Sequence, residues 1–332
     1  MKKRKGIIER LVMGKPREKD LTEADLPSTR TKQFRFVFKT RFGIIFRANL
    51  LAALFCVPYI MWELLSGAYI TNFVKGMEAA EHVSYLLYLT LLQYGTEIPL
   101  LMLSFVGLAG AYYVVRRICW GQSVKIVADF GRGIKQSWLQ FMLLGLLTGI
   151  VSLLINYAVN LALLTMGGNN ALVWGLGLTA ILLFAVLYSI IVMFAMCQST
   201  LYNLSFARLL YNSTVLTFKR LFRSLLICLA SLAPILVLVL MPWVFVKIVG
   251  YSLVVVFSIG FAVTLQTVYC HGVFDTFINA KDYPDFVGMG LAGAKLPEEL
   301  LGESADDMAE NTVEEQSEQL EQPEQPDNED NE

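Results

Sequence analysis

Charged residues are scarce in this 332-residue chain. They make up 17% of it, whereas residues of the apolar and aromatic set make up 55%. A soluble domain has roughly 25% charged residues, because its surface must meet water. The chain therefore meets lipid over much of its length. This composition excludes a soluble enzyme, a secreted disulfide scaffold and a fibrous protein.

Residues that support catalysis or metal binding are also few. The chain has two histidines and five cysteines, and no two cysteines have CxxC spacing. The cysteines lie in or beside apolar runs, so we interpret them as small hydrophobes in helices. Cys270, His271 and Asp275 have a helical ligand spacing, but a zinc site needs three or four ligands in a closed geometry. No nucleotide-binding or protease motif occurs in a usable context. The sequence predicts no enzyme activity, cofactor or metal site.

Apolar runs of membrane length are what the chain has instead. About 20 apolar residues cross the roughly 30 Å hydrocarbon layer as a helix. Six runs qualify, at 48–66, 98–115, 139–164, 174–198, 225–246 and 250–270. Lys247 and Gly250 separate the last two, so a tight hairpin is expected there. The first run starts too late for a cleavable signal peptide, so it is expected to be an anchor. These runs predict an all-α polytopic membrane bundle with six transmembrane helices.

The segment between the first two runs, residues 67–97, is expected to be a long outer loop. Residues 83–92 within it are apolar but too short to cross, which favours an interfacial or re-entrant helix. With this assignment, Glu63 lies at the end of a span and Glu97 lies in the loop. The middles of all six spans then lack ionisable residues, which argues against a pump with a carboxylate relay.

Basic residues set the predicted orientation. Of the 27 Lys and Arg residues, 25 fall in the N-terminus, the connections after the second and fourth runs, and the C-terminus. Lys and Arg concentrate on the cytoplasmic side of membrane proteins. We therefore expect a bacterial cytoplasmic membrane protein with both termini in the cytoplasm.

The two ends of the chain carry opposite charge. Residues 1–47 have 14 Lys and Arg against five Asp and Glu, whereas residues 298–332 have 15 Asp and Glu and no Lys or Arg. We expect a basic cytoplasmic segment (1–47), a six-span membrane domain (48–270), a cytoplasmic connector (271–302) and an acidic disordered tail (303–332). The tail is interpreted either as solubilising or as binding basic segments, including the chain's own N-terminus.

A weak internal repeat precedes the odd-numbered spans. Segments 36–42, 129–138 and 218–223 each alternate aromatic and basic residues. Their cations are Lys39, Arg41, Arg132, Lys135, Lys219 and Arg220. At a membrane interface, rings occupy the headgroup boundary and cations face anionic lipid. Two interpretations stay open: three related hairpins, each preceded by a surface helix, or convergent interfacial composition.

The third span has the clearest polar stripe. Gly145 and Gly149 have the GxxxG spacing that lets another helix approach closely. Asn156 and Asn160 are four residues apart and share one helix face. We favour helix packing with interhelical hydrogen bonds, and the alternative is a polar solute site lined by the two asparagines.

The centre of the chain has a Gly/Ala-rich span, Gly107 to Gly121, closed by the pair Arg116-Arg117, and after a short loop the stretch Asp129-Phe130-Gly131-Arg132-Gly133-Ile134-Lys135. In these motifs the chain resembles the YesL-like family of bacterial multi-pass membrane proteins of unknown function. Gly131 stands where a second Phe is common in the family, and the acidic tail departs from the family's compact pattern. The resemblance implies an accessory role near carbohydrate uptake and carries no active residues.

The sequence thus favours an accessory or regulatory membrane component of solute uptake, with carbohydrate as the solute class. The alternative is an autonomous small-solute transporter or channel, for which Asn156, Asn160 and Glu97 are the polar candidates. Expected partners are anionic lipid headgroups and either transporter subunits or further copies of the chain. No nucleic-acid partner is expected, because no DNA-binding fold accompanies the basic N-terminus.

Overall fold

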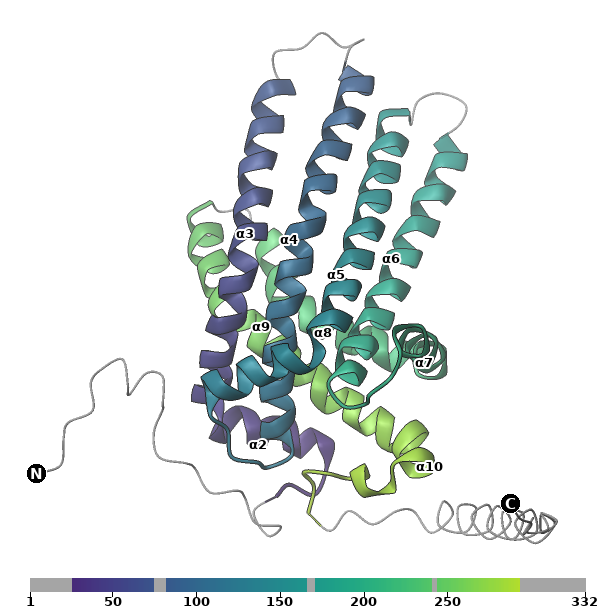
Figure 1. Ribbon diagram of the computed structural model, residues 1–332. Helices are drawn as coiled ribbons and strands as arrows, with labels where there is room; N and C mark the ends of the chain where they lie inside the picture. Colours follow the sequence, from purple (N-terminus) through teal and green to yellow (C-terminus); the bar gives the residue numbers. More distant parts are fainter. Residues whose placement is uncertain (1–25, 75–81, 166–170, 241–243, 293–332) are drawn as a thin grey trace, which may run out of the picture.

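The computed structural model describes residues 26–74, 82–165, 171–240 and 244–292 (Figure 1). All regular structure in these ranges is helical. The long helices are α3 (Phe42–Val74), α4 (His82–Cys119), α5 (Ile126–Thr165), α6 (Ala171–Ser199), α8 (Leu221–Leu240) and α9 (Val244–Phe274). The short ones are α2 (Arg30–Thr40), α7 (Phe206–Lys219), η3 (Asp275–Asn279), α10 (Ala280–Asp282) and η4 (Pro284–Phe286).

The predicted all-α architecture is confirmed for the described residues, and helices of membrane length are present. Five helices are long and apolar enough to cross a membrane, in the segments Phe42–Gly67, Tyr85–Cys119, Ile126–Leu163, Leu172–Ser199 and Val256–Asp282. The predicted span at 225–246 covers most of α8, whose apolar stretch among the described residues is Leu221–Pro234, and it continues through residues 241–243, which lie outside the described ranges. The count of six spans therefore stays a prediction.

The predicted outer loop at 67–97 is wrong. Helix α3 continues to Val74, and α4 runs without a break from His82 to Cys119. Residues 83–92 are therefore part of a long helix and not a separate interfacial or re-entrant one. The polar residues before the second apolar run suggested a helix end, but Glu97 is buried, with 1% of its surface exposed. Packing thus keeps the helix intact through a polar stretch.

The predicted hairpin at Lys247 and Gly250 is also misplaced. Both residues lie inside α9, which begins at Val244, and α8 ends at Leu240. Residues 241–243, between the two helices, lie outside the described ranges. A helix tends to end before the residue that precedes a proline. Pro242 is therefore a stronger signal for a helix end than a single Lys or Gly is. The predicted connector 271–302 likewise begins inside α9.

Figure 1 shows α3, α4, α5 and α6 rising side by side, with α8 and α9 behind their lower parts. We call the end of the bundle that contains α2, α7 and α10 the lower end. Three segments lie across it and precede the helix pairs: α2, the first turns of α5, and α7. These correspond to the three basic aromatic stretches of the sequence.

The first and third of these segments end with the same local geometry. Arg41 follows α2 with φ −115° and ψ 16°, and its N–H donates to the carbonyl of Val37. Arg220 follows α7 with φ −133° and ψ 33°, and its N–H donates to the carbonyl of Leu216. The second segment differs, because α5 continues through its bend as one helix. Two of the three hairpins thus share a local geometry that the second does not.

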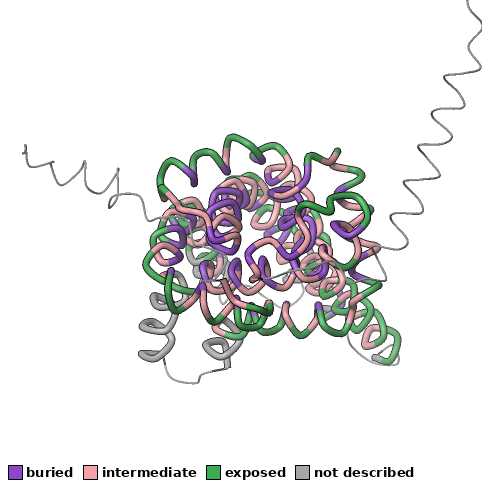
Figure 2. Tube along the Cα trace, turned by 90° about the horizontal axis from the view of Figure 1, so that it is seen from below, coloured by how far each residue is buried: buried purple, intermediate pink, exposed green. Residues whose placement is uncertain are grey.

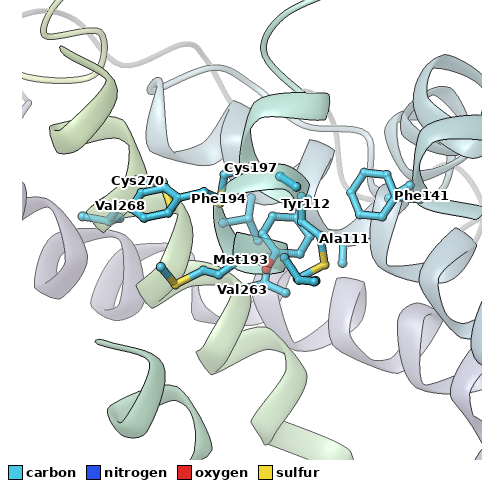
Figure 3. Close-up of a cluster of buried hydrophobic side chains, with 14 of the residues drawn as sticks. Ala111, Tyr112, Phe141, Met193, Phe194, Cys197, Val263, Val268 and Cys270 are labelled. Carbon is cyan, nitrogen blue, oxygen red and sulfur yellow. The ribbon is translucent and has the colours of Figure 1, made fainter. Parts of the chain in front are cut away.

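The hydrophobic core lies in the lower half of the bundle. Figure 3 shows Tyr112 from α4 between side chains of α5 and α6. The Tyr112 and Phe141 ring centroids are 6.0 Å apart, and the Tyr112 hydroxyl donates to Oε1 of Gln266 on α9. Seen from below, buried residues gather near the centre of the bundle and exposed residues at its edge (Figure 2). Four helices therefore meet around one buried tyrosine.

The upper half of α6 is apolar and exposed. Leu172, Leu176 and Leu182 expose 74%, 66% and 60% of their surface, whereas residues 192–199 of the same helix are buried. Large exposed apolar patches are rare on soluble monomers and typical of surfaces that face lipid or a partner. The upper half is therefore suited to a bilayer, and the lower half is a packed core.

Candidate functional site

The lower end is cross-linked by buried polar side chains. Gln33 of α2 is completely buried, and its Nε2 donates to the carbonyls of Cys119 at 2.7 Å and Gly290 at 3.1 Å. One amide group thus joins α2, the end of α4 and the segment after α9. Without Gln33, two buried carbonyls would lack a partner, which is costly.

Arg30 adds a second link at the same place. Its guanidinium donates to Oε1 of Gln33 at 2.8 Å and to the carbonyl of Met289 at 3.0 Å. It also forms an ion pair with Asp275 of η3. Asp275 is thereby used in a structural contact. Among the described residues, no group of three or more His, Cys, Asp or Glu side chains is placed to hold a metal ion.

The two ends of the described chain meet at this position. The N–H of Ala292 donates to the carbonyl of Pro27 at 3.1 Å. Gly290 has φ +81°, and a Cβ built there would lie 2.0 Å from the carbonyl oxygen of Cys119, so only glycine fits. Pro27, within the basic segment 1–47, and Ala292, which shortly precedes the acidic tail in the sequence, therefore lie side by side.

Asp129 organises the connection between α4 and α5. Its carboxylate accepts from Arg117 at 2.7 Å, from Arg132 at 3.2 Å and from the backbone N–H of Lys125 at 2.7 Å. Asp129 is buried and lies in the first turn of α5, where a negative charge is favoured by the helix dipole. This carboxylate fixes how the chain turns from α4 into α5.

The connection between α6 and α7 is held by side chains from α4 and α5. Arg116 donates to the carbonyl of Thr200, and its guanidinium lies 5.1 Å from the Trp120 ring centroid. Ser137 donates to the carbonyl of Ser199 at 3.1 Å, and Gln140 to that of Leu204 at 2.7 Å. Three helices therefore meet at this loop.

Tyr202 connects the same loop to the C-terminal segment. Its hydroxyl donates to Oδ1 of Asn279 at 2.5 Å. Burial, followed by the negative charge of Asp275, raises the pKa of Tyr202. The hydroxyl therefore keeps its proton and stays a donor at any physiological pH.

The six predicted interfacial cations take different positions at the lower end. Lys39, Arg132, Lys135 and Lys219 are exposed, whereas Arg41 is buried and Arg220 is half-buried. Lys219 and Arg220 lie over the Phe277 ring, 4.9 and 5.2 Å from its centroid. Burial lowers the pKa of Arg41. Four of the six can thus face lipid headgroups directly, and Arg41 has a position inside the fold.

The predicted stripe on the third span lies against α4. A Cβ on Gly145 would be 2.8 Å from Cα of Met102, and one on Gly149 would be 3.1 Å from Cα of Ile98. Asn160 donates to the hydroxyl of Thr90 on α4 at 3.1 Å. Asn156 instead donates to the carbonyl of Ser152 in its own helix, at 2.9 Å. The two asparagines therefore have different partners and do not form a pair.

Glu97, the third polar candidate, lies in the middle of α4 and is buried. It is seven residues beyond Thr90, on the same helix face, so α4 carries the contacts of Asn160 and Glu97 along one side. The expectation that the span middles lack ionisable residues is wrong. The mistaken loop at 67–97 had placed this carboxyl group outside the membrane.

The described helices form an all-helical bundle in which five helices are long and apolar enough to cross a membrane. Comparison of the chain with protein-family models, with curated proteins and with solved structures found no match. The resemblance to the YesL-like family therefore stays a prediction from the sequence.

Proposed function

We propose that the protein is a multi-pass component of the bacterial cytoplasmic membrane that binds and regulates other components of a solute-uptake system. The observation that carries the proposal is the contact between Pro27 and Ala292. It brings Pro27, within the basic segment 1–47, next to Ala292, which shortly precedes the acidic tail in the sequence. Opposed charges on adjacent segments suit electrostatic binding of partners more than they suit solute passage.

The orientation supports this function. Exposed cations of the described chain lie on α2, the start of α3, the α4–α5 connection, the start of α5, α7, the start of α8 and α10. All these segments belong to the lower end (Figure 1). Because cytoplasmic segments of membrane proteins are enriched in Lys and Arg, the lower end and both termini face the cytoplasm. The charged poles are thus accessible to cytoplasmic partners.

Carbohydrate is the proposed solute class because of the resemblance to the YesL-like family. The deciding experiment measures uptake of labelled sugars in a strain that lacks the protein. The strain is complemented with the full chain or with a chain that ends at residue 302. An accessory role predicts that uptake of at least one sugar falls in the deletion strain and is restored only by the full chain.

Reconstitution separates this role from autonomous transport. The purified full chain is placed in liposomes, and uptake of the same labelled sugars is measured. An accessory component transports none of them alone. Sugar uptake by the protein alone would overturn the proposal.

An autonomous transporter or channel is the second candidate, and the buried polar contacts along α4 favour it. The variant Asn156→Ala/Asn160→Ala tests the two asparagines in the liposome assay. A transport path through them predicts lost uptake with unchanged helical content. Normal uptake by a folded double variant would exclude them from the path.

The proposed orientation has its own test. A reporter inserted after Lys125 is expected to read as cytoplasmic, and one inserted after Gly168 as external. The opposite pattern would contradict the charge argument without affecting the fold.

A further inference from the structure

Two carboxyl groups face each other between α3 and α4, well away from the lower end. Glu97 lies in the middle of α4 with 1% of its surface exposed, and Glu63 lies opposite it on α3 and is exposed. Gln93, one helical turn before Glu97 on α4, contacts Glu63, so the two carboxyl groups lie at the same level of the hairpin. Oε1 of Glu97 is buried and has no hydrogen-bond partner. An intramembrane carboxyl group of this kind is a functional candidate by default.

Gln93 connects the two helices at this level. Its Nε2 lies 3.4 Å from Oε2 of Glu63, and its backbone carbonyl accepts from Nε1 of Trp62 at 3.3 Å. Gln93 precedes Glu97 by one helical turn and therefore shares its face of α4. The amide holds Glu63 beside Glu97.

Among the described residues, no cation forms an ion pair with either acid. The chain has Lys75 as its only Lys or Arg between Arg47 and Arg116. The ion pairs among the described residues involve Asp129 and Asp275 at the lower end, and neither Glu63 nor Glu97 takes part in them. Two facing carboxylates without a cation would repel each other in a medium of low polarity.

One bound proton removes the repulsion between the two carboxylates. Ionised carboxylates only accept hydrogen bonds, so the two groups can bond to each other only if one of them is protonated. Burial disfavours the charged form as well, because an ion in hydrocarbon loses its hydration. Both effects favour one proton held between Glu63 and Glu97.

Both helices also have a weak point at the same level. Pro58 lies in α3 and Pro99 in α4, and neither can donate a backbone hydrogen bond. The contacts of Ser104 with the carbonyl of Phe55 and of Trp62 with that of Gln93 show that the two prolines lie at nearly the same height. Helices kink most readily at proline, so the carboxyl pair lies close to the positions where α3 and α4 can bend.

We propose that Glu63 and Glu97 form a proton-binding site in the membrane-spanning part of the α3–α4 hairpin. Glu97 is the buried group that retains the proton, and the exposed Glu63 is the group through which the proton exchanges with the surroundings. The site is independent of the accessory role proposed above. It concerns residues far from the charged termini.

Dicyclohexylcarbodiimide tests the proposal on the purified full chain. A protonated carboxyl group adds across its N=C=N unit: the carboxyl oxygen bonds to the central carbon, and the proton moves to nitrogen. The O-acylisourea formed then rearranges to a stable N-acylurea, and no group leaves. Mass spectrometry of the peptides locates the adduct and measures its yield.

We expect the adduct on Glu97 in the wild type, with a yield that falls about tenfold per pH unit once the site loses its proton. Glu63→Gln is expected to shift the pH of half-labelling, because it removes the acidic neighbour. Asp285→Asn, an exposed acid of the lower end, serves as the matched control and leaves the profile unchanged. An unlabelled Glu97, or the same pH profile in wild type and Glu63→Gln, would overturn the proposal.

Sodium distinguishes a proton site from a cation site. Labelling is repeated at constant pH in equal concentrations of sodium chloride and choline chloride. Equal yields support proton binding, and protection by sodium alone overturns it in favour of a cation site. Infrared spectra of the wild type provide a second readout, in which a protonated-carboxyl band must be lost in Glu97→Gln.

The infrared comparison counts only if size-exclusion chromatography and circular dichroism show that Glu97→Gln is folded. If that variant does not fold, the pH profiles of the wild type and of Glu63→Gln decide the question. The labelling and infrared measurements report on the two carboxyl groups directly, so their results do not depend on the sugar-uptake experiments.

Discussion

The lower and upper halves of the bundle are held together by different forces. In the lower half, Gln33, Arg116 and Tyr202 join segments far apart in the chain through directional hydrogen bonds. In the upper half, α6 presents large exposed leucines. Apolar contacts alone give helices little preference for packing on one another over packing on lipid, because lipid tails are as apolar as leucine. The comparison indicates that the polar lower end determines the arrangement of the helices.

The largest difference is expected between two positions on the same helix. Phe194→Ala in the core should lower the free energy of unfolding by about 3–5 kcal/mol, because it leaves a cavity. Leu182→Ala in the exposed half should cost about 1 kcal/mol or less. Unfolding in mixed micelles, followed by circular dichroism, measures both. Equal losses would contradict the division into two halves.

The buried amide of α2 is expected to have the next largest effect. Gln33→Leu should cost about 2–4 kcal/mol, because the carbonyls of Cys119 and Gly290 lose their donor. Lys32→Leu, at the exposed neighbouring position, is the matched control and should change stability little. If the two variants unfold alike, the polar link does not stabilise the lower end.

Substitution of the glycine at the place where the two ends of the described chain meet is also expected to lower the stability. Gly290→Ala should cost about 2 kcal/mol, because its φ of +81° is strained for alanine and the new Cβ meets the carbonyl of Cys119. Gly131→Ala is the control, since nothing lies within 4 Å of a Cβ there. The control should be neutral or slightly stabilising, as alanine favours helix. The same unfolding assay compares them.

Asn160 and Asn156 offer a smaller contrast in the upper half. Asn160→Ala should cost about 1 kcal/mol, since its hydrogen bond to Thr90 joins α5 to α4. Asn156→Ala removes a bond within α5 and should cost less. A greater loss at Asn156 would show that the assigned partners are wrong.

The smallest expected effect is one of pH. Because the pKa of Tyr202 is raised in the folded protein, the unfolded chain releases this proton first as the pH rises. The stabilisation is complete below about pH 10, the ordinary tyrosine value, and decreases above it. Tyr202→Phe should lose about 1 kcal/mol near neutrality and show a weaker alkaline decline. Parallel curves for both proteins would contradict this.

Several features of the fold could be predicted from local sequence. Five of the six apolar runs fall wholly on helices, and the described residues of the run at 225–246 fall on α8 and the start of α9. Runs of this length can satisfy their backbone only as helix when water is absent. The limits of these helices could not be predicted in the same way. Glu97 suggested a loop because a charged residue is costly in a membrane, yet it lies buried in an unbroken α4, one turn from Gln93, which contacts Glu63 of α3.

The candidate sites divide in a similar way. The spacing of Gly145 and Gly149 predicted a close helix approach, since glycine spacing is a local property. The buried position of Gln33 could not be predicted from its neighbours, because the polar, aromatic and basic residues of α2 together have the pattern of a surface helix. Its partners are 86 and 257 residues away. A contact at such separation has no local signature.

The amino-acid sequence by itself determined the class of this protein, a bundle of helices of membrane length with charge concentrated at its ends. Composition and periodicity describe residues that are close in sequence. Helices of membrane length and charged ends depend only on such residues. Only the tertiary structure decided that Pro27 meets Ala292, that α4 is unbroken and that Gln93, one turn from Glu97, meets Glu63 of α3. Those contacts depend on how separate helices pack, because a buried polar group takes whichever partner the packing brings within reach.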